Sequence, residues 1–181
     1  MKRKTTKDIL LESFRELAES NPVDRITIQE IVDNCGYSPA TFYRQFQDKY
    51  DLIAWDYSKS VAKIMEKIDG SYTWKQSLLD GAEHFFREKD YLENLLRHTG
   101  GHDSFVRYMT DINCSALEKH ILLTSGQEKL SSDEEMYIRL YCMGTVCLTC
   151  EWILGLHEAT VEELAEIYMN SLPAPLHKYL L

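Results

Sequence analysis

Apolar residues recur every three or four positions along most of this chain, which is the spacing of one face of an α-helix. Runs that alternate apolar and polar residues, as strands do, are absent, and only four prolines and eight glycines interrupt the pattern. The sequence therefore predicts an all-α fold. The expected helices cover residues 7–20, 28–34, a short stretch from Pro39, 48–68, 74–89, 91–98, 103–125, 132–155 and 160–172.

Residues 27–39 predict a sharp corner between two short helices. The hydroxyl of Thr27 suits a helix start, and Gly36 in the following turn accepts a left-handed backbone. Ser38 is a second candidate cap, and Pro39 suits the first position of a helix. Local chemistry alone thus indicates helix, three-residue turn, helix, although many helical proteins contain such corners.

The second helix of this corner divides into two faces. Phe42 and Phe46 are four residues apart and are expected to anchor it to a core. The remaining positions carry small, hydroxyl, amide and guanidinium groups, which suit a DNA groove. They are Ala40, Thr41, Tyr43, Arg44 and Gln45. Lys49 follows at the start of the next helix, where a cation and free N–H groups favour a phosphate.

The charge of the chain is unevenly distributed. Its formal net charge is -9, but residues 1–60 carry nine basic and ten acidic side chains, against eleven and nineteen in the rest. The acidity therefore lies mainly behind the corner, and it does not exclude a polyanionic partner. The basic residues of the arm Lys2-Arg3-Lys4 either add contacts to DNA or form a solubilising tail.

The run ITIQEIVDNCGYSPATFYRQFQDKYDLI resembles the DNA-binding domain of the TetR/AcrR family of transcriptional regulators. The elements of that resemblance are Ile26-Thr27-Ile28, Gly36, Thr41-Phe42-Tyr43, Phe46 and Lys49 to Leu52, and they lie within residues 5–55. More loosely, DKYDLIAW and the tail from Trp152 resemble a Firmicutes-type subgroup that includes the regulator of dihydroxyacetone kinase genes, in which activation involves a partner protein.

The resemblance implies a homodimeric regulator of duplex DNA. It assigns residues 1–50 to the DNA-binding domain and 51–181 to regulation and dimerisation, linked by a fourth helix at 48–69. The helices at 132–155 and 160–172 would form the dimer interface, and repression is the expected sign, with activation as an alternative. The residues that the resemblance places at DNA are Thr27, Gln29, Ser38, Pro39, Ala40, Thr41, Tyr43, Arg44, Gln45 and Lys49.

Two modes of control are open. A small ligand would need a cavity, for which the aromatic candidates are Trp74, Phe85, Phe86, Tyr108, Tyr141 and Trp152, unless these side chains only fill a core. A protein partner would instead need an exposed apolar patch.

Other classes of function have less support. Cys147 and Cys150 form a CxxC, but their apolar helical setting favours buried thiols, and His98 and His102 lack a clear third ligand. Metal sensing and a small helical enzyme are therefore remote alternatives, no cofactor is expected, and no catalytic set is recognisable. The absence of an apolar run of about 18 residues and of a secretory core predicts a cytoplasmic protein without a membrane segment.

Overall fold

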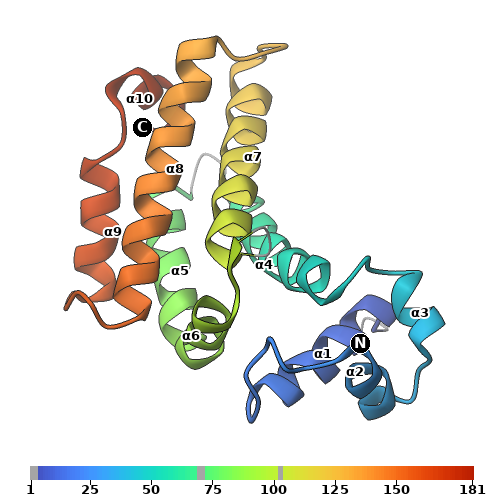
Figure 1. Ribbon diagram of the computed structural model, residues 1–181. Helices are drawn as coiled ribbons and strands as arrows, with labels where there is room; N and C mark the ends of the chain where they lie inside the picture. Colours follow the sequence, from blue (N-terminus) through green and yellow to red (C-terminus); the bar gives the residue numbers. More distant parts are fainter. Residues whose placement is uncertain (1–3, 69–71, 102–103) are drawn as a thin grey trace. The chain divides into compact units, whose positions relative to one another are not determined.

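The computed structural model describes residues 4–68, 72–101 and 104–181, and all regular secondary structure within these ranges is helical. Figure 1 shows the order of the helices along the chain. Their bounds are α1 (Thr6–Ala18), α2 (Ile28–Cys35), α3 (Pro39–Tyr43), α4 (Lys49–Met65), α5 (Trp74–Arg87), α6 (Lys89–His98), α7 (Phe105–Ser125), α8 (Ser132–Ile153), α9 (Val161–Asn170), the short 3-10 helix η2 (Ala174–Leu176) and α10 (His177–Leu180).

The predicted all-α fold is confirmed, with most helices slightly shorter than expected. The α4 helix ends at Met65 and not near Ile68, and it has 17 residues, so its length is about 25 Å. The pattern did not indicate the helical turns after Pro173. No helix in the described ranges is long and apolar enough to cross a membrane.

The chain forms two compact units. Unit 1 comprises residues 1–56 and 90–105, and unit 2 comprises residues 57–89 and 106–181, within the described ranges. The chain therefore passes between the units three times, and the second half of α4 belongs to unit 2.

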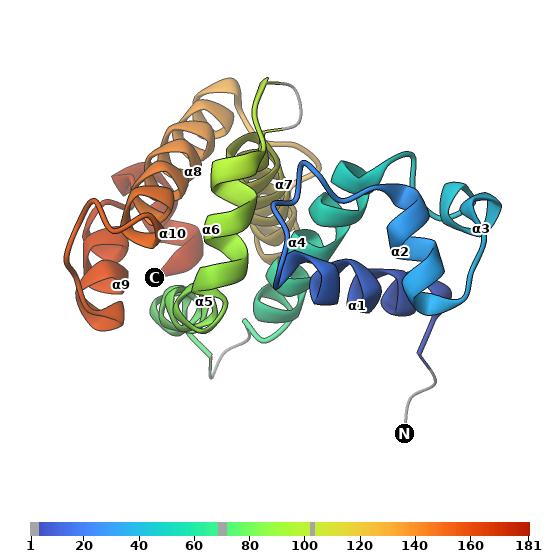
Figure 2. The ribbon, with the colours of Figure 1, turned by 60° about the horizontal axis from the view of Figure 1, so that its bottom comes forward.

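Unit 1 is built on the apolar faces of α1 to α3, the start of α4, and α6. Leu10, Phe14, Ile31, Phe42 and Leu52 are fully buried in it. Figure 2 shows α2 and α3 meeting at a sharp turn.

A partly buried ion pair ties α1 to α4 within unit 1. Nε and Nη2 of Arg15 donate to one carboxylate oxygen of Asp56, at 3.0 and 2.8 Å. The Tyr91 hydroxyl of α6 donates to the same oxygen at 3.3 Å, and its ring lies 4.3 Å from the Arg15 guanidinium carbon. A cation, a carboxylate and an aromatic ring thus join three helices.

Asn94 fastens α6 to the end of α1 more directly. Its amide nitrogen donates to the carbonyls of Ala18 and Asn21, both at 2.8 Å, and its oxygen accepts from the Val23 N–H at 3.1 Å. One side chain therefore pairs the last carbonyl of α1 and two backbone groups of the segment that follows it.

Unit 2 places α8 between α7 and α9, with α5 packed against α9 (Figure 1). The Tyr141 hydroxyl on α8 donates to the Tyr168 carbonyl on α9 at 3.0 Å, and Arg139 on α8 pairs with Asp111 on α7 at 2.7 Å. The apolar residues after α9 return to this core. Leu172, Leu176 and Leu180 are buried in the same cluster as Leu117, Ile121, Leu130 and Ile138.

Candidate DNA-binding surface and C-terminal cavity

The start of α2 is fixed by a reciprocal cap. The Thr27 hydroxyl accepts from the Glu30 N–H at 3.2 Å, while the Glu30 carboxylate accepts from the Thr27 N–H at 2.8 Å and from its hydroxyl. These hydrogen bonds from Thr27 lower the pKa of Glu30. The cap predicted at Thr27 is therefore present, and it is a complete capping box.

The turn between α2 and α3 also follows its sequence. Gly36 has φ 73°, a left-handed value that favours glycine, and the Tyr37 N–H donates to the Val32 carbonyl at 2.9 Å. The Ser38 hydroxyl then accepts from the Thr41 N–H at 3.3 Å, with Pro39 at the first helical position. These local bonds fix the direction in which α3 leaves the turn.

The predicted division of α3 into two faces is confirmed for its anchors. Phe42 and Phe46 are buried, and their ring centroids lie 5.7 Å apart. Tyr43 has 57% of its surface exposed, and its ring packs edge-on against Phe42. The hydroxyl of Tyr43 and the amide of Gln45 have no hydrogen-bond partner in the described part of the chain. Tyr43 at the end of α3 and the half-buried Gln45 in the following turn therefore offer unused polar groups beside a fixed core.

Some predicted contact residues already make local bonds. The Gln29 amide donates to Asp33 at 2.7 Å, the Ser38 and Thr41 hydroxyls lie 3.1 Å apart, and Nε of Arg44 donates to the Ala40 carbonyl at 3.2 Å. Ala40 is exposed and Pro39 half-buried. All these residues except Gln29 belong to α3 or its caps, so they form one continuous surface.

Lys49 occupies a position that the sequence did not indicate. Its ammonium donates to the carbonyls of Val23, Asp24 and Ile26, at 2.9, 2.7 and 2.8 Å. Burial lowers the pKa of Lys49, while Asp24 and other nearby carboxylates oppose this effect. All three N–H donors of the ammonium are engaged, so a phosphate contact requires Lys49 to share one of them.

The N-terminal arm is described only from Lys4, because Lys2 and Arg3 lie outside the described residues. The Lys4 ammonium pairs with Glu12 at 2.8 Å, and both side chains are exposed. An exposed pair of this kind contributes little to stability.

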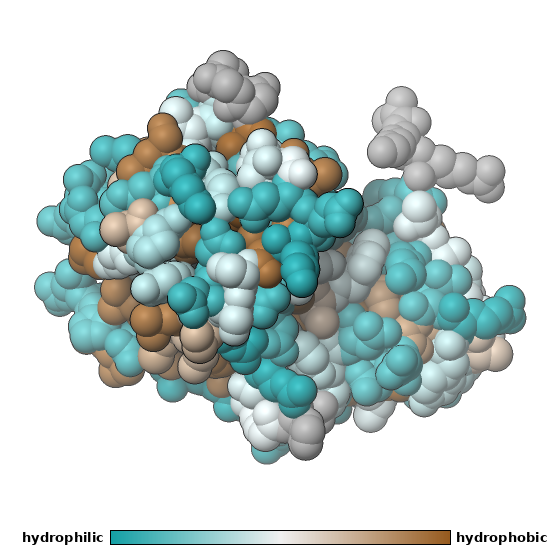
Figure 3. Space-filling model, turned by 90° about the horizontal axis from the view of Figure 1, so that it is seen from above, coloured by the Kyte–Doolittle hydropathy of each residue, from teal (hydrophilic) through white to brown (hydrophobic). Residues whose placement is uncertain are grey.

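An exposed apolar stripe runs along α8. Met136, Leu140 and Met143 are three or four residues apart, and 68% of the surface of Leu140 is exposed. Ile167 on α9 is also exposed. Brown apolar patches interrupt the teal surface of unit 2 in Figure 3. Single exposed apolar residues are ordinary, but a stripe at helical spacing is typical of a contact surface.

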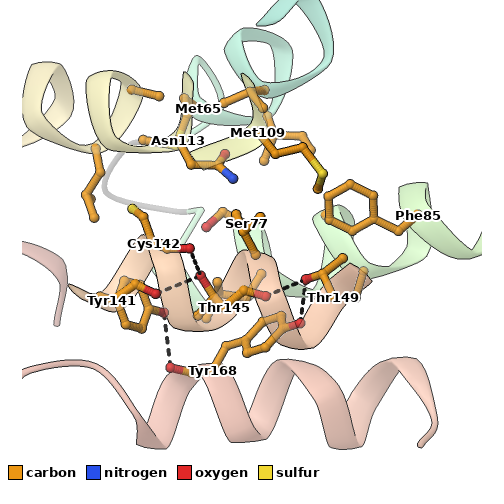
Figure 4. A pocket seen from close by; sticks show the side chains of 18 of the residues that line it. Met65, Ser77, Phe85, Met109, Asn113, Tyr141, Cys142, Thr145, Thr149 and Tyr168 are labelled. Carbon is orange, nitrogen blue, oxygen red and sulfur yellow. Dashed lines mark hydrogen bonds between the residues drawn. The ribbon is translucent and has the colours of Figure 1, made fainter. Parts of the chain in front are cut away.

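Unit 2 contains a cavity of about 120 Å³, bounded by α4, α5, α7, α8 and α9. Trp74, Phe85 and Tyr141 line it, as do several polar residues that the sequence analysis did not select. Figure 4 shows Ser77, Asn113, Thr145 and Thr149 around this space. Two other aromatic candidates, Phe86 and Trp152, instead line an open hollow beside α9, whereas Tyr108 is half-buried and lines neither space.

Asn113 had a recognisable signal in the sequence. It stands in α7 between Met109 and Leu117, and Met109, Leu117 and Ile121 are buried at intervals of four residues around it. A polar residue within such a buried row needs a partner or a function. The Asn113 amide donates to the hydroxyl of Tyr57, and burial raises the pKa of Tyr57.

An open groove of about 510 Å³ follows the second half of α4 and α7. Val61, Met65 and Ala116 line both this groove and the cavity. These three side chains therefore lie between the cavity and the groove.

The metal and thiol alternatives gain no support. Within the described ranges there is no group of three or more His, Cys, Asp or Glu residues that could hold a metal ion, and His102 lies outside them. Cys150 is buried, as predicted, but the same prediction is wrong for Cys147, which is exposed. Cys147 and Cys150 are three residues apart, less than one helical turn, so they face different sides of α8. Cys147 follows Met143 by about one turn and therefore lies on the same side of α8 as Met143.

A capped short helix, held by buried phenylalanines after a glycine turn, defines a helix-turn-helix DNA-binding unit. The chain belongs to the TetR family of bacterial regulatory proteins. Residues 10–54 match the family model described as "Bacterial regulatory proteins, tetR family", and residues 72–173 match "Transcriptional regulator C-terminal region".

One curated relative is the HTH-type dhaKLM operon transcriptional activator DhaS of Lactococcus lactis subsp. lactis (strain IL1403). It is 27% identical to this chain over 74 residues, which are 41% of this chain and 40% of the relative. The match therefore spans less than half of the length of that relative.

Solved structures share the fold over nearly the whole chain. The dihydroxyacetone kinase operon activator DhaS has a TM-score of 0.65 at 20% identity, covering 97% of this chain and 98% of its own. A TetR transcriptional regulator from Rhodococcus sp. RHA1 has a TM-score of 0.64 at 15% identity, with coverages of 93% and 96%. The TetR family repressor AlkX from Dietzia sp. strain DQ12-45-1b has a TM-score of 0.59 at 14% identity, with both chains covered completely. The protein is thus a TetR-type transcriptional regulator.

Proposed function

We propose that this regulator binds a two-fold-symmetric DNA site as a homodimer, in the cytoplasm, through the exposed face of α3. The observation that carries the proposal is the position of Tyr43 at the end of α3 and of Gln45 in the turn that follows it, whose polar groups are unused beside the buried Phe42 and Phe46. Two copies of α3 would enter successive major grooves, with half-site centres about 34–36 Å apart.

The predicted contacts fall into two classes. We assign phosphate contacts to Thr27, Tyr43 and Lys49, because hydroxyl and ammonium groups bind phosphate oxygens without reading sequence. Base or sugar contacts are assigned to Gln29, Pro39, Ala40, Thr41 and Gln45, with Arg44 serving either role. Ser38 lies at the start of α3, close enough to its neighbours to share the backbone contact.

Dimerisation is assigned to the stripe of Met136, Leu140 and Met143 on α8, with Ile167 on α9. An exposed row of apolar side chains favours a partner surface because burying it removes apolar area from water. A second copy of this chain supplies the same row, as an isologous interface requires.

Control of DNA binding is assigned to the cavity of unit 2. A ligand that prefers one spacing of the two α3 helices would shift the population towards it and change the affinity for DNA. We propose that the protein is a repressor and that binding of the ligand releases it from DNA.

A second candidate is an activator controlled by a protein partner. The relative DhaS is named as an operon activator, which supports activation over repression. The open hollow of about 570 Å³, lined by Phe86 and Trp152, would be the surface for such a partner. Phe86, which lines this hollow, and Leu156, which is next to the lining residue Gly155, are both highly exposed. The two candidates differ in whether purified protein alone responds to a small molecule.

The DNA-binding proposal is tested with Tyr43→Phe, which removes only the hydroxyl. We expect weaker binding to every duplex, by roughly 3- to 10-fold, because a lost hydrogen bond costs about 0.5–1.5 kcal/mol. Tyr72→Phe, in the segment before α5, is the matched control and should bind normally. Fluorescence anisotropy with duplexes selected from a random pool gives the affinities. Equal affinities of the two variants and the parent protein would remove Tyr43 from the DNA surface.

A further inference from the structure

The cavity of unit 2 has no ionisable carboxylate, ammonium, guanidinium or imidazole group in its lining, so far as the chain is described. An ionised ligand would lose its hydration there without gaining a counter-charge, and such a transfer is very unfavourable. The lining therefore selects uncharged molecules.

The size of the cavity sets a second limit. An engineered protein cavity of about 150 Å³, lined by apolar side chains, binds benzene. The cavity described here measures about 120 Å³. It therefore accommodates a compact molecule of about six non-hydrogen atoms.

Most hydroxyl groups around the cavity donate to groups of the protein itself. Ser77 donates to the Trp74 carbonyl at 2.6 Å, and Thr145 donates to the Tyr141 carbonyl at 2.9 Å. The hydroxyls of Thr149 and Tyr168 are hydrogen-bonded to each other, as Figure 4 shows. These groups have no donor to spare for a ligand.

Two other groups keep unused donors. The Asn113 amide nitrogen donates one N–H to the Tyr57 hydroxyl at 2.9 Å, and its second N–H has no partner in the described chain. The buried indole N–H of Trp74 makes no hydrogen bond of ordinary geometry to any described residue, although the Tyr141 hydroxyl is near. Both residues line the cavity. An unpaired buried donor is costly, so an oxygen that accepts from it is favoured.

The rest of the cavity lining described here is apolar. In Figure 4, Met65, Met109 and Phe85 lie on the side of the cavity opposite α8 and α9. A polyol would place hydroxyl groups against these side chains without partners, which disfavours it. A hydrocarbon body with one accepting oxygen satisfies both parts of the lining.

We propose that the cavity binds a small uncharged organic molecule with a single carbonyl or ether oxygen, held by the Asn113 amide and packed against Met65, Phe85 and Met109. The inference rests on the proposed control by a small ligand and specifies the chemical class of that ligand.

Three probes of nearly equal size test this class. Cyclopentanone carries one carbonyl oxygen, and methylenecyclopentane has the same shape with a CH₂ group in place of that oxygen. Glycerol carries a hydroxyl group on every carbon. Binding is measured without DNA, by thermal shift and by the indole N–H resonances in NMR spectra, with Trp74→Phe identifying the Trp74 signal. We expect the ketone to bind roughly 3- to 10-fold more tightly than the alkene, because one hydrogen bond contributes about 0.5–1.5 kcal/mol. Glycerol should give no shift at the same concentration.

A paired variant locates the preference. Asn113→Leu alone would remove the N–H that the buried Tyr57 hydroxyl accepts, so it is combined with Tyr57→Phe, which makes both groups apolar. The double variant should bind ketone and alkene equally, while Tyr57→Phe alone should keep the preference for the ketone. Equal binding of ketone and alkene by the parent protein, binding of glycerol, or no binding of any probe would overturn the proposal.

DNA binding is then measured separately. If cyclopentanone binds as expected but leaves the affinity for DNA unchanged, the chemical class stands and the proposed ligand control fails. If Tyr43→Phe binds DNA normally while the ketone still binds, only the assignment of the DNA surface fails.

Discussion

The ammonium of Lys49 donates a hydrogen bond to the carbonyl of Ile26 at 2.8 Å, and this contact holds the first turn of α4 against the residues that lead into α2. The same group serves the carbonyls of Val23 and Asp24. Since Ile26 immediately precedes the Thr27 cap, Lys49 helps to fix the position of the start of α2.

Replacing Lys49 with Met should destabilise unit 1. Three carbonyls lose a charged donor, and we expect the free energy of unfolding to fall by about 1–3 kcal/mol. Thermal and urea unfolding of the purified protein measure this loss. Lys63→Met, in the exposed part of the same helix, should leave stability unchanged. A Lys49 variant as stable as the Lys63 variant would contradict the structural role.

The same Lys49 variant also tests the predicted phosphate contact. If the ammonium meets a phosphate in the complex, one fewer counterion is released, and the slope of log K against log salt falls in magnitude by about one. Anisotropy titrations at several salt concentrations give this slope, provided that the variant is folded at the temperature used. An unchanged slope would restrict Lys49 to its structural role.

Gln45→Ala should relax the sequence preference more than the overall affinity. A side-chain amide that pairs with a base edge contributes about 1–3 kcal/mol of discrimination at that position. Selection from a random DNA pool, carried out for both proteins, should show one base position becoming degenerate. Gln47→Ala is the control, because Gln47 is exposed beyond α3 and is assigned no base. Identical selected sequences for the parent and Gln45→Ala would disprove base readout by Gln45.

Leu140→Glu should convert the proposed dimer into a monomer. A carboxylate in the middle of an apolar interface would be buried without a partner. Light scattering coupled to gel filtration at micromolar concentration gives the mass. Leu123→Glu, at an even more exposed leucine on α7, should leave the dimer intact. If Leu140→Glu is still dimeric, the interface lies elsewhere.

Stability should fall in acid through Glu134. This carboxylate accepts from the Tyr179 hydroxyl at 2.6 Å and from the Ser131 N–H at 2.9 Å, and these bonds, with the one from Tyr179 strongest, lower its pKa to about 2. Because the ordinary pKa of Glu is about 4.3, the stabilisation is fully present above that pH and is lost as the pH falls towards 2.

Urea midpoints at pH 6 and pH 3 measure this effect. Glu134→Gln should be less stable than the parent at pH 6 and should lose less on acidification. Glu128→Gln, at an exposed residue before α8, is the matched control and should follow the parent. An acid response of Glu134→Gln equal to that of the parent would show that another group is responsible.

The parts of the fold that follow from neighbouring residues could be predicted. Thr27, Gly36 and Ser38 act within four positions of the groups that they cap or turn, so the corner before α3 is readable from a short window. The burial of Phe42 and Phe46 follows in the same way from helical spacing.

Contacts between distant residues could not be predicted. The sequence predicts a helix that contains Tyr91 and Asn94, but it does not indicate that both bind residues of the first 56 positions in unit 1. The spacing of α6 gives its apolar face but not the surface against which that face packs. Similarly, Lys49 resembles a phosphate ligand in its motif, and only the folded chain brings the carbonyl of Ile26 to it.

The amide of Asn94 has a mechanical consequence. It donates to two carbonyls and accepts from one N–H, so its orientation is determined, and turning it over would oppose donor to donor. Sliding α6 along α1 by one residue would break all three bonds together. These three bonds therefore hold α6 to the end of α1 and to the segment that follows it, within unit 1.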